Sequence, residues 1–193
     1  MAARDQTVAG ASGRQDPSFK PDGGGHKPDL PRPGEAWVVL HTRPRCEKKL
    51  QSFCERMAVP VYLPLRRRPH RYGARERVFW TPLFPGYIFC CATLSQQGTL
   101  RQNNHVANLL EVLDQPKLVD QLRQIHQALA VDDLVEVQPY LAVGHRVRVL
   151  SGPFKDLEGY VNRVKGRTKV MVNVDMIQQA VCFEVEAACL GPA

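Results

Sequence analysis

Residues 36–57 read AWVVLHTRPRCEKKLQSFCERM. The run from Trp37 to Leu40 is continuous, apolar and rich in β-branched residues, which predicts a central strand covered on both faces. After this run, apolar residues recur at helical spacing while polar residues fill the positions between them. The spacing predicts a helix over residues 46–57, and Pro60 closes it. A strand followed by an amphipathic helix favours a domain that mixes α and β structure.

The segments that follow predict more strands and two more helices. Strands are expected over residues 61–65, 78–81, 87–92 and 106–113. A long hairpin is expected to turn at Gly73, and Ser95 is expected to cap a short helix. Apolar residues between 118 and 129 mark a full helix that opens near Pro116, where proline is tolerated. Residues 35–130 therefore predict an α+β domain, an antiparallel sheet with its helices on one side.

From residue 142 to residue 193 the apolar pattern changes to period two. Apolar and polar residues alternate at 147–149, 170–176 and 181–185. Glycines separate these short segments. About fifty residues with this spacing suit a small closed barrel better than a sandwich of two large sheets. The acidic residues 131–141 are expected to form a linker between the two domains.

The N-terminus and the overall composition narrow the class of protein. Residues 1–34 hold five prolines and six glycines and almost no large apolar side chain, which predicts a disordered tail. Among 193 residues, Lys plus Arg number 26 against 19 for Asp plus Glu. The formal charge of +7 favours a polyanionic partner. No apolar run approaches the ~20 residues of a membrane span or follows the N-terminus as a signal peptide would, so a cytoplasmic protein without a membrane partner is expected.

Residue types that carry chemistry form no catalytic or metal-binding motif. The six cysteines contain no C-x-x-C pair and the six histidines no H-E-x-x-H, so no metal or cofactor is expected. The cysteines are expected to be buried free thiols. His41 and Cys46 lie five residues apart, but no third group is placed to orient them. We therefore expect that the protein is not an enzyme.

Two motifs indicate a family. The first is PLFPGYIF at residues 82–89, preceded by AWVVLHTRPRCEKKL at 36–50, and the second is VRVLSGPFKDLEGYVNRV at 147–164. In this order and separation they resemble the NusG family of transcription elongation factors, over about residues 36–188. The resemblance implies an N-terminal NGN domain and a C-terminal KOW domain, which is a small SH3-like β-barrel.

Two further segments resemble one branch of that family. TRPRCEKK at residues 42–49 and VYLPLRRR at 61–68 are most like the specialised UpxY and LoaP antiterminators. This resemblance implies that the targets are a few long operons, with recruitment by a leader element.

The family resemblance implies that RNA polymerase is the main partner, bound through an apolar cleft at Trp37, Phe84 and Tyr87. Phe84 lies between two prolines in a loop, so its side chain is expected to project into the partner. Trp37 and Tyr87 fit equally well as core residues with one exposed edge. A protein that bridges the polymerase clamp across the DNA channel would disfavour the paused state and promote processive elongation and antitermination.

The predicted hairpin is strongly basic, since residues 66–77 hold six arginines against Glu76 alone. The candidate nucleic-acid contacts are Arg66, Arg67, Arg68, Arg71, Tyr72, Arg75 and Arg77. Such an arm offers phosphate contacts and one stacking surface, which suits upstream duplex, non-template DNA or leader RNA. The alternative is a solvated hairpin whose charges prevent aggregation at a sheet edge.

In the C-terminal domain, the resemblance matches Phe154 to a loop aromatic that binds a ribosomal protein or a termination factor. The alternative is that Phe154 caps one end of the barrel. Gly86 and Gly159 are expected to be structural, with a positive φ or a close backbone approach.

A second class of function stays open at this point: a ribosome-associated or free RNA-binding protein that acts without polymerase. Polymerase binding would depend on Phe84 and survive moderate salt. RNA binding alone would need the arginines and fall steeply with salt.

Overall fold

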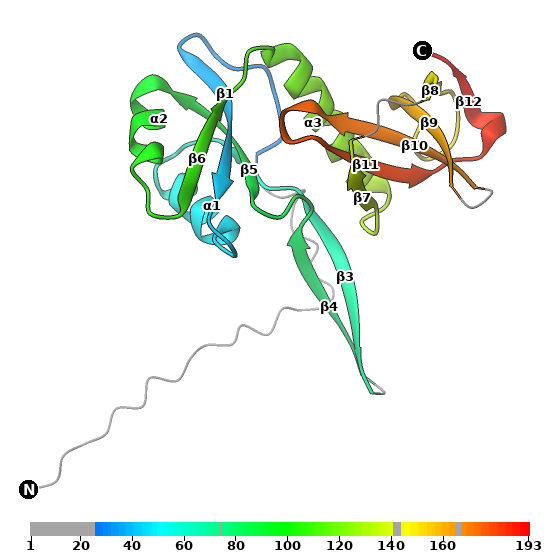
Figure 1. Cartoon of the computed structure of the whole chain (residues 1–193), viewed down its shortest axis with the longest axis horizontal. Helices are drawn as coiled ribbons and strands as arrows, with labels where there is room; N and C mark the ends of the chain where they lie inside the picture. The colour runs from blue at the N-terminus through cyan, green and yellow to red at the C-terminus, as the bar shows by residue number, and fades with distance from the viewer. Residues whose placement is uncertain (1–25, 74, 141–143, 165–166) are drawn as a thin grey trace, which may run out of the picture.

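The computed structural model describes residues 26–73, 75–140, 144–164 and 167–193. The first part of the chain forms β1 (Glu35–Thr42), α1 (Glu47–Arg56), β2 (Val61–Tyr62), β3 (Leu65–Tyr72), β4 (Arg75–Pro82), β5 (Tyr87–Thr93), α2 (Leu94–Arg101), β6 (Val106–Glu111) and α3 (Gln115–Val131). The second part forms β7 (Glu136–Pro139), β8 (Arg146–Val149), β9 (Glu158–Val164), β10 (Arg167–Val174), η1 (Asp175–Ile177), β11 (Gln179–Glu184), η2 (Ala187–Cys189) and β12 (Leu190–Pro192). Strands pair in the orders β2-β5-β1-β6, here called the N-terminal sheet, and β12-β8-β9-β10-β11-β7, here called the C-terminal sheet. Strands β3 and β4 pair only with each other and project away from both sheets as a long hairpin (Figure 1).

The N-terminal sheet is antiparallel and is covered on both faces. β1 lies between β5 and β6, and the four residues from Trp37 to Leu40 are all buried. Val38 and Leu40 pack with residues of α1 and α2, while Trp37 and Val39 pack with residues of α3. The predicted central strand is therefore confirmed. The prediction that the helices lie on one side is wrong, because a strand that is apolar on both faces needs cover on both.

Several elements differ in detail from their predicted form. The strand expected at 61–65 is interrupted before β3 begins at Leu65. The cap of α2 is Thr93 and not Ser95, because the Thr93 hydroxyl accepts from the Gln96 N–H while the Gln96 side chain bonds back to the Thr93 N–H. Gly73 does lie in the hairpin turn, with φ of 60°. α3 opens after Asp114 with proline in its first turn, as predicted.

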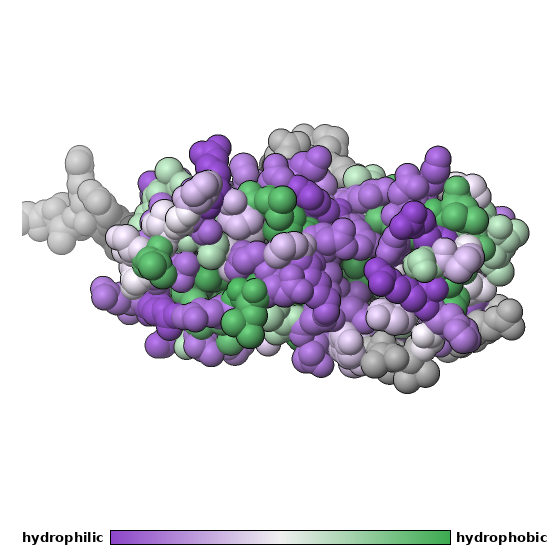
Figure 2. Space-filling view, turned by 90° about the horizontal axis from the view of Figure 1, so that it is seen from above, coloured by the Kyte–Doolittle hydropathy of each residue, from purple (hydrophilic) through white to green (hydrophobic). Residues whose placement is uncertain are grey.

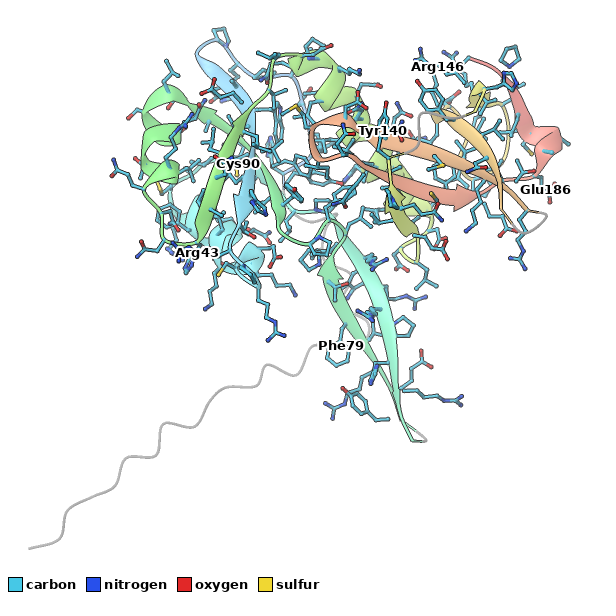
Figure 3. The ribbon with its side chains drawn as sticks, in the orientation of Figure 1. Arg43, Phe79, Cys90, Tyr140, Arg146 and Glu186 are labelled. Atoms are coloured by element: carbon cyan, nitrogen blue, oxygen red, sulfur yellow. The ribbon has the colours of Figure 1, made fainter. Side chains whose placement is uncertain are left out.

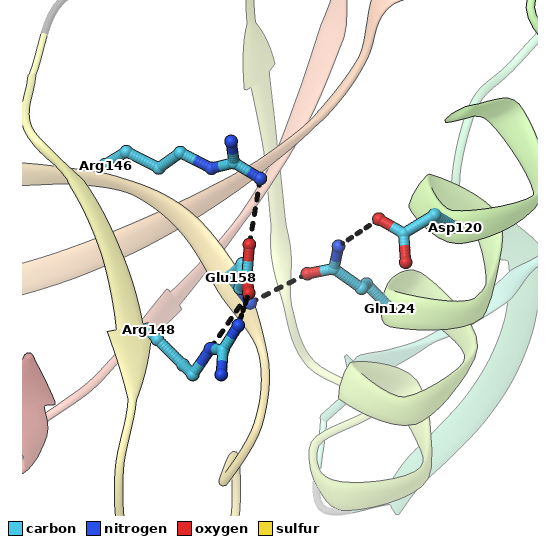
Figure 4. Close-up of polar contacts among 5 residues, drawn as sticks. All are labelled: Asp120, Gln124, Arg146, Arg148 and Glu158. Carbon is cyan, nitrogen blue, oxygen red and sulfur yellow. Dashed lines mark hydrogen bonds and ion pairs between the residues drawn. The ribbon is translucent and has the colours of Figure 1, made fainter. Parts of the chain in front are cut away.

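Helix α3 lies between the two sheets (Figure 1). Its apolar side packs on the N-terminal sheet through residues such as Leu118, Leu122 and Ile125. Its polar side faces the C-terminal sheet, where Lys117 Nζ lies 2.6 Å from Asp175 Oδ2 and Gln124 Oε1 accepts from the Glu158 N–H at 2.8 Å (Figure 4). A cavity of about 240 Å³ separates the helix from this sheet beside these contacts. Helix α3 thus contacts both sheets.

The C-terminal sheet has the predicted short antiparallel strands. Val149, Val170, Val172 and Val181 are almost fully buried and form its core. β7, in residues expected to be a linker, adds an edge strand through Val137 opposite Val181. No pairing joins β12 to β7 among the described residues, so the closed barrel stays a prediction.

Residues 26–34, expected to belong to a disordered tail, lie against the folded chain. The His26 N–H donates to the Val61 carbonyl at 2.8 Å, and Pro28 is buried. The Trp37 indole N–H donates to the Asp29 carbonyl at 2.7 Å, and Arg123 forms an ion pair with Asp29. These hydrogen bonds compensate for the low apolar content on which the tail prediction rested. The rest of that prediction falls on residues 1–25, outside the described residues.

The face of the molecule seen in Figure 2 is mainly polar. In Figure 2, hydrophobic residues form separate small groups among hydrophilic ones. None of the helices in the described ranges is long and apolar enough to cross a membrane. Within those ranges, no three His, Cys, Asp or Glu side chains gather in a way that could hold a metal ion.

Candidate functional site

The loop between β4 and β5 is held firmly against α1 and β1. The Gly86 N–H donates to Glu47 Oε1 at 2.8 Å, and the Gly86 carbonyl accepts from the Thr42 N–H at 2.8 Å. Gly86 has φ of +86°, a conformation that favours glycine. A Cβ there would meet only ordinary contact with His41 at 3.6 Å, so the backbone conformation is what requires glycine. The loop therefore presents the start of β5 in one defined position.

The three predicted polymerase contacts lie on the α3 side of the N-terminal sheet. Trp37 and Phe84 are each 1% exposed, and Phe84 packs edge-on against Phe89 with ring centroids 6.2 Å apart. Tyr87 is partly exposed and stacks on His41 at 5.1 Å. The structure therefore places Phe84 in the core, where its ring is removed from water, and not in the projecting position expected from its flanking prolines. Tyr87 is the member of this group with an exposed edge.

The hairpin has two different faces, because side chains of paired strands alternate between them. The cationic face consists of Arg66, Arg68, His70, Tyr72, Arg77, Phe79 and Thr81. The inner face consists of Arg67, Pro69, Arg71, Glu76, Val78 and Trp80. The predicted contacts are therefore divided between two surfaces. The Arg75 backbone belongs to β4, but its side chain lies outside the described part of the structure.

Contacts confirm this division of the hairpin. The His70 and Tyr72 rings meet at 4.5 Å on the cationic face. On the inner face, Arg67 Nε lies 3.0 Å from Asp133 Oδ1, and Trp80 is buried. The inner face is thus turned toward the body of the protein at the base of the hairpin, and its charge is partly neutralised.

A basic pocket of about 340 Å³ lies at the base of the cationic face. We call it the base pocket; its lining includes Arg45, Lys48, Arg66, Arg68 and Thr81. Its acidic lining residue, Glu47, is buried and already accepts the Gly86 N–H. The Nε of Arg66 and the hydroxyl of Thr81 have no hydrogen-bond partner among the described residues, although both atoms are shielded from solvent. The pocket therefore concentrates positive charge at the base of the hairpin.

In the C-terminal sheet, Phe154 is partly buried and stacks on Phe183 with ring centroids 4.6 Å apart. This position agrees with its alternative reading as a cap over the core. A Cβ on Gly159 would lie 2.3 Å from the Met171 carbonyl oxygen, so close backbone approach, and not a positive φ, requires glycine there. The loop that holds Phe154 also bonds to α3, since Gln127 Nε2 donates to the Lys155 carbonyl at 2.8 Å.

Sequence analysis missed three parts of this site. Phe79 is 39% exposed and lies opposite Arg68 in the register, whereas the sequence pattern predicts it only as part of a returning strand. Strand alternation would have placed it with the arginines. Arg45 and Lys48 lie near the start of α1, and no local pattern brings them to the hairpin.

Comparisons with known proteins agree with this architecture. Residues 35–128, which span the N-terminal sheet and most of α3, match a protein family described as "Transcription termination factor nusG". The chain is also similar to the "Transcription termination/antitermination protein NusG" of Thermus thermophilus, with 26% identity over 163 residues that cover 72% of this chain and 89% of that protein. Over residues 35–128 the chain is therefore similar to the NusG family of transcription termination and antitermination factors, and its similarity to the Thermus protein extends further along the chain.

Proposed function

We propose that this protein is a transcription elongation and antitermination factor that binds RNA polymerase through its N-terminal sheet and helices. It acts by binding, without catalysis or a cofactor. The match of residues 35–128 to the NusG family is the observation that carries the proposal. The C-terminal sheet acts as a KOW domain and offers a second surface, for a ribosomal protein or a termination factor.

The polymerase-binding surface is built around Tyr87 and His41 at the start of β5. Their stacked rings give a rigid aromatic surface, and the exposed Pro85 lies beside it in the chain. The hydrogen bonds of Gly86 fix this surface relative to α1, so little conformational entropy is lost on binding. Phe84 supports the surface from inside and does not itself reach the partner.

The hairpin supplies the second half of the mechanism. It projects from the body, so a factor seated on polymerase can reach nucleic acid that leaves the enzyme (Figure 1). Its arginines provide attraction to phosphates with no recognition helix to read sequence. Contacts on two sides of the transcription complex would favour the closed, elongating state over the paused one. The target is a small set of long operons, in line with the specialised branch.

The test is binding of the full chain to core RNA polymerase by surface plasmon resonance. We expect Tyr87→Ala to weaken binding by about tenfold or more, as truncation of an aromatic anchor does. The control is Leu94→Ala, which removes an apolar side chain that is 83% exposed at the opposite end of β5. Wild-type binding should persist at moderate salt because the contact is largely apolar.

Failure of the wild-type chain to bind polymerase, with RNA still bound in a salt-sensitive way, would contradict the proposal. That result would favour a ribosome-associated or free RNA-binding protein. Equal effects of the Tyr87 and Leu94 substitutions would contradict the location of the surface but not the partner.

A further inference from the structure

We propose that Cys54 and Cys90 form a site of reversible oxidation, at which a peroxide converts the two thiols to a disulfide that links α1 to β5. The site lies on the α1 side of the N-terminal sheet, opposite the side that carries Trp37 and Phe84. The inference stands without the proposed function, because it concerns only the chemistry of the two thiols.

The two thiols are neighbours in the structure, although they are 36 positions apart in the sequence. Cys54 Sγ lies 3.7 Å from Cys90 Sγ, and both side chains are fully buried. Cys54 belongs to α1, and Cys90 lies in β5 within the N-terminal sheet (Figure 3). The sulfurs of a disulfide are about 2.05 Å apart, so these two atoms need to approach by about 1.7 Å. A change of rotamer moves a sulfur atom by more than this distance.

The backbone holds the two elements in this position. The Val59 N–H donates to the Cys54 carbonyl at 2.9 Å, and this bond turns the chain from α1 toward β2. At the start of β2, Val61 pairs directly with Cys90. A short connection with defined hydrogen bonds therefore places Cys54 beside Cys90.

Among the described residues, the other four cysteines have no thiol beside them. Cys91 follows Cys90, but successive side chains of a strand point to opposite faces, so its Sγ lies 3.8 Å from Glu35 Oε2 instead. Burial raises the pKa of the Cys91 thiol to about 11, which lowers its content of reactive thiolate. No thiol–thiol contact forms within the described ranges at the remaining three cysteines, Cys46, Cys182 and Cys189.

The hydrogen bond between the two thiols assigns the first step to Cys54. This bond lowers the pKa of Cys54 and raises that of Cys90. The Cys54 thiolate attacks one oxygen of hydrogen peroxide, so the O–O bond breaks, a sulfenic acid forms, and the released hydroxide takes up the thiol proton as water. The Cys90 sulfur then displaces the hydroxyl group from the sulfenic acid. The S–S bond forms, and the Cys90 proton leaves with that hydroxyl as a second water.

Peroxide reaches the buried pair when α1 opens, and the ends of this helix favour opening. Arg45 and Ala58 flank α1 with φ of 61° and 52°, in the left-handed region that is costly for residues other than glycine. The N-cap residue, Cys46, makes no side-chain hydrogen bond to the first turn. Local opening of the helix exposes Cys54 without unfolding the sheet. The disulfide, once formed, opposes further opening because it links the helix to β5.

The experiment exposes the reduced full chain to hydrogen peroxide, removes the peroxide with catalase, alkylates the remaining thiols and maps tryptic peptides by mass spectrometry. The expected product has lost two of its six thiols and links residues 50–56 to residues 78–101. Dithiothreitol should remove the link by thiol–disulfide exchange. Cys90 and Cys91 share the second peptide, so they are the matched pair of variants. Cys90→Ala should abolish the link, and Cys91→Ala should leave it unchanged.

A second measurement tests the effect of the link on folding. A disulfide constrains the unfolded chain, so oxidation should lower the equilibrium constant for unfolding in urea about 30- to 700-fold. An oxidised chain that unfolds as readily as the reduced one would contradict the link between α1 and β5.

The inference would be overturned if all six thiols of the wild-type chain survive peroxide, or if oxidation is confined to the partly exposed Cys46 and Cys189. It would also be overturned if Cys91→Ala, and not Cys90→Ala, removes the link. The wild-type peptide map decides whether the link forms, so this outcome does not depend on the folding of a variant.

Discussion

Docking of the C-terminal sheet on α3 decides whether the protein moves as one body. The contact includes two hydrogen bonds of 2.8 Å, in which the Glu158 N–H donates to Gln124 Oε1 and Gln127 Nε2 donates to the Lys155 carbonyl. Each such bond contributes about 0.5–1.5 kcal/mol net. The double substitution Gln124→Ala and Gln127→Ala should therefore remove about 1–3 kcal/mol and lower the ratio of docked to undocked molecules about 5- to 150-fold.

The ion pair across the interface allows a rescue experiment. Hydrogen bonding to Asp175 raises the pKa of Lys117, which favours the charged form of the lysine. The pair is largely exposed, with 57% of the Lys117 side chain and 32% of the Asp175 side chain accessible, so it contributes about 0–1 kcal/mol. Asp175→Lys should loosen docking, and adding Lys117→Asp should restore it.

The assay is ¹⁵N relaxation of backbone amides, which gives a rotational correlation time for each sheet. The wild-type sheets should tumble together, whereas in the glutamine double variant the C-terminal sheet should tumble faster. Gln102→Ala, at an exposed position after α2, is the control. The reasoning would be refuted if the C-terminal sheet already tumbles independently in the wild type. It would also be refuted if the relaxation of the glutamine double variant equals that of the wild type at every residue.

Three other predictions test the core on which the sites depend. Phe84→Ala should cost about 3–5 kcal/mol in the free energy of unfolding, measured by urea titration of tryptophan fluorescence, and a loss below about 1 kcal/mol would mean that the ring is exposed in solution. Burial raises the pKa of the Cys91 and Cys182 thiols from 9.0 to about 11. The thiols of the unfolded chain ionise at lower pH than the buried ones, so the free energy of unfolding should be unaffected below pH 9. Between pH 9 and 11 it should fall by up to ~1.4 kcal/mol per pH unit for each thiol. A urea-unfolding free energy that stays constant across that window would contradict the burial. Gly159→Ala should lower the melting temperature of the C-terminal sheet in calorimetry, because the added Cβ would overlap the Met171 carbonyl at an overpacking cost of about 1–3 kcal/mol. An unchanged melting temperature would exclude that close approach.

The fold could be predicted from the sequence wherever local pattern decides it. The apolar run from Trp37 to Leu40, the spacing in α1 and α3 and the alternation of β10 and β11 all give the element that is observed. The errors concern packing between elements. β10 shows the limit clearly, since Met171 and Asn173 alternate with its valines yet are buried as well. Their side of the strand faces α3, 50 residues earlier in the chain, and no pattern within the strand reports that.

The candidate site shows the same limit with greater consequence for function. The number of arginines in the hairpin was visible in the sequence, but the choice of face depends on Asp133, in residues that looked like an irregular linker. Asp133 accepts the Arg67 N–H through its carbonyl at 2.8 Å and the Arg67 side chain through its carboxylate at 3.0 Å. Because side chains alternate along a strand, holding Arg67 against the body turns Arg66 and Arg68 outward. A single acidic residue just after α3 therefore holds Arg67 on the inner face and leaves Arg66 and Arg68 on the cationic face.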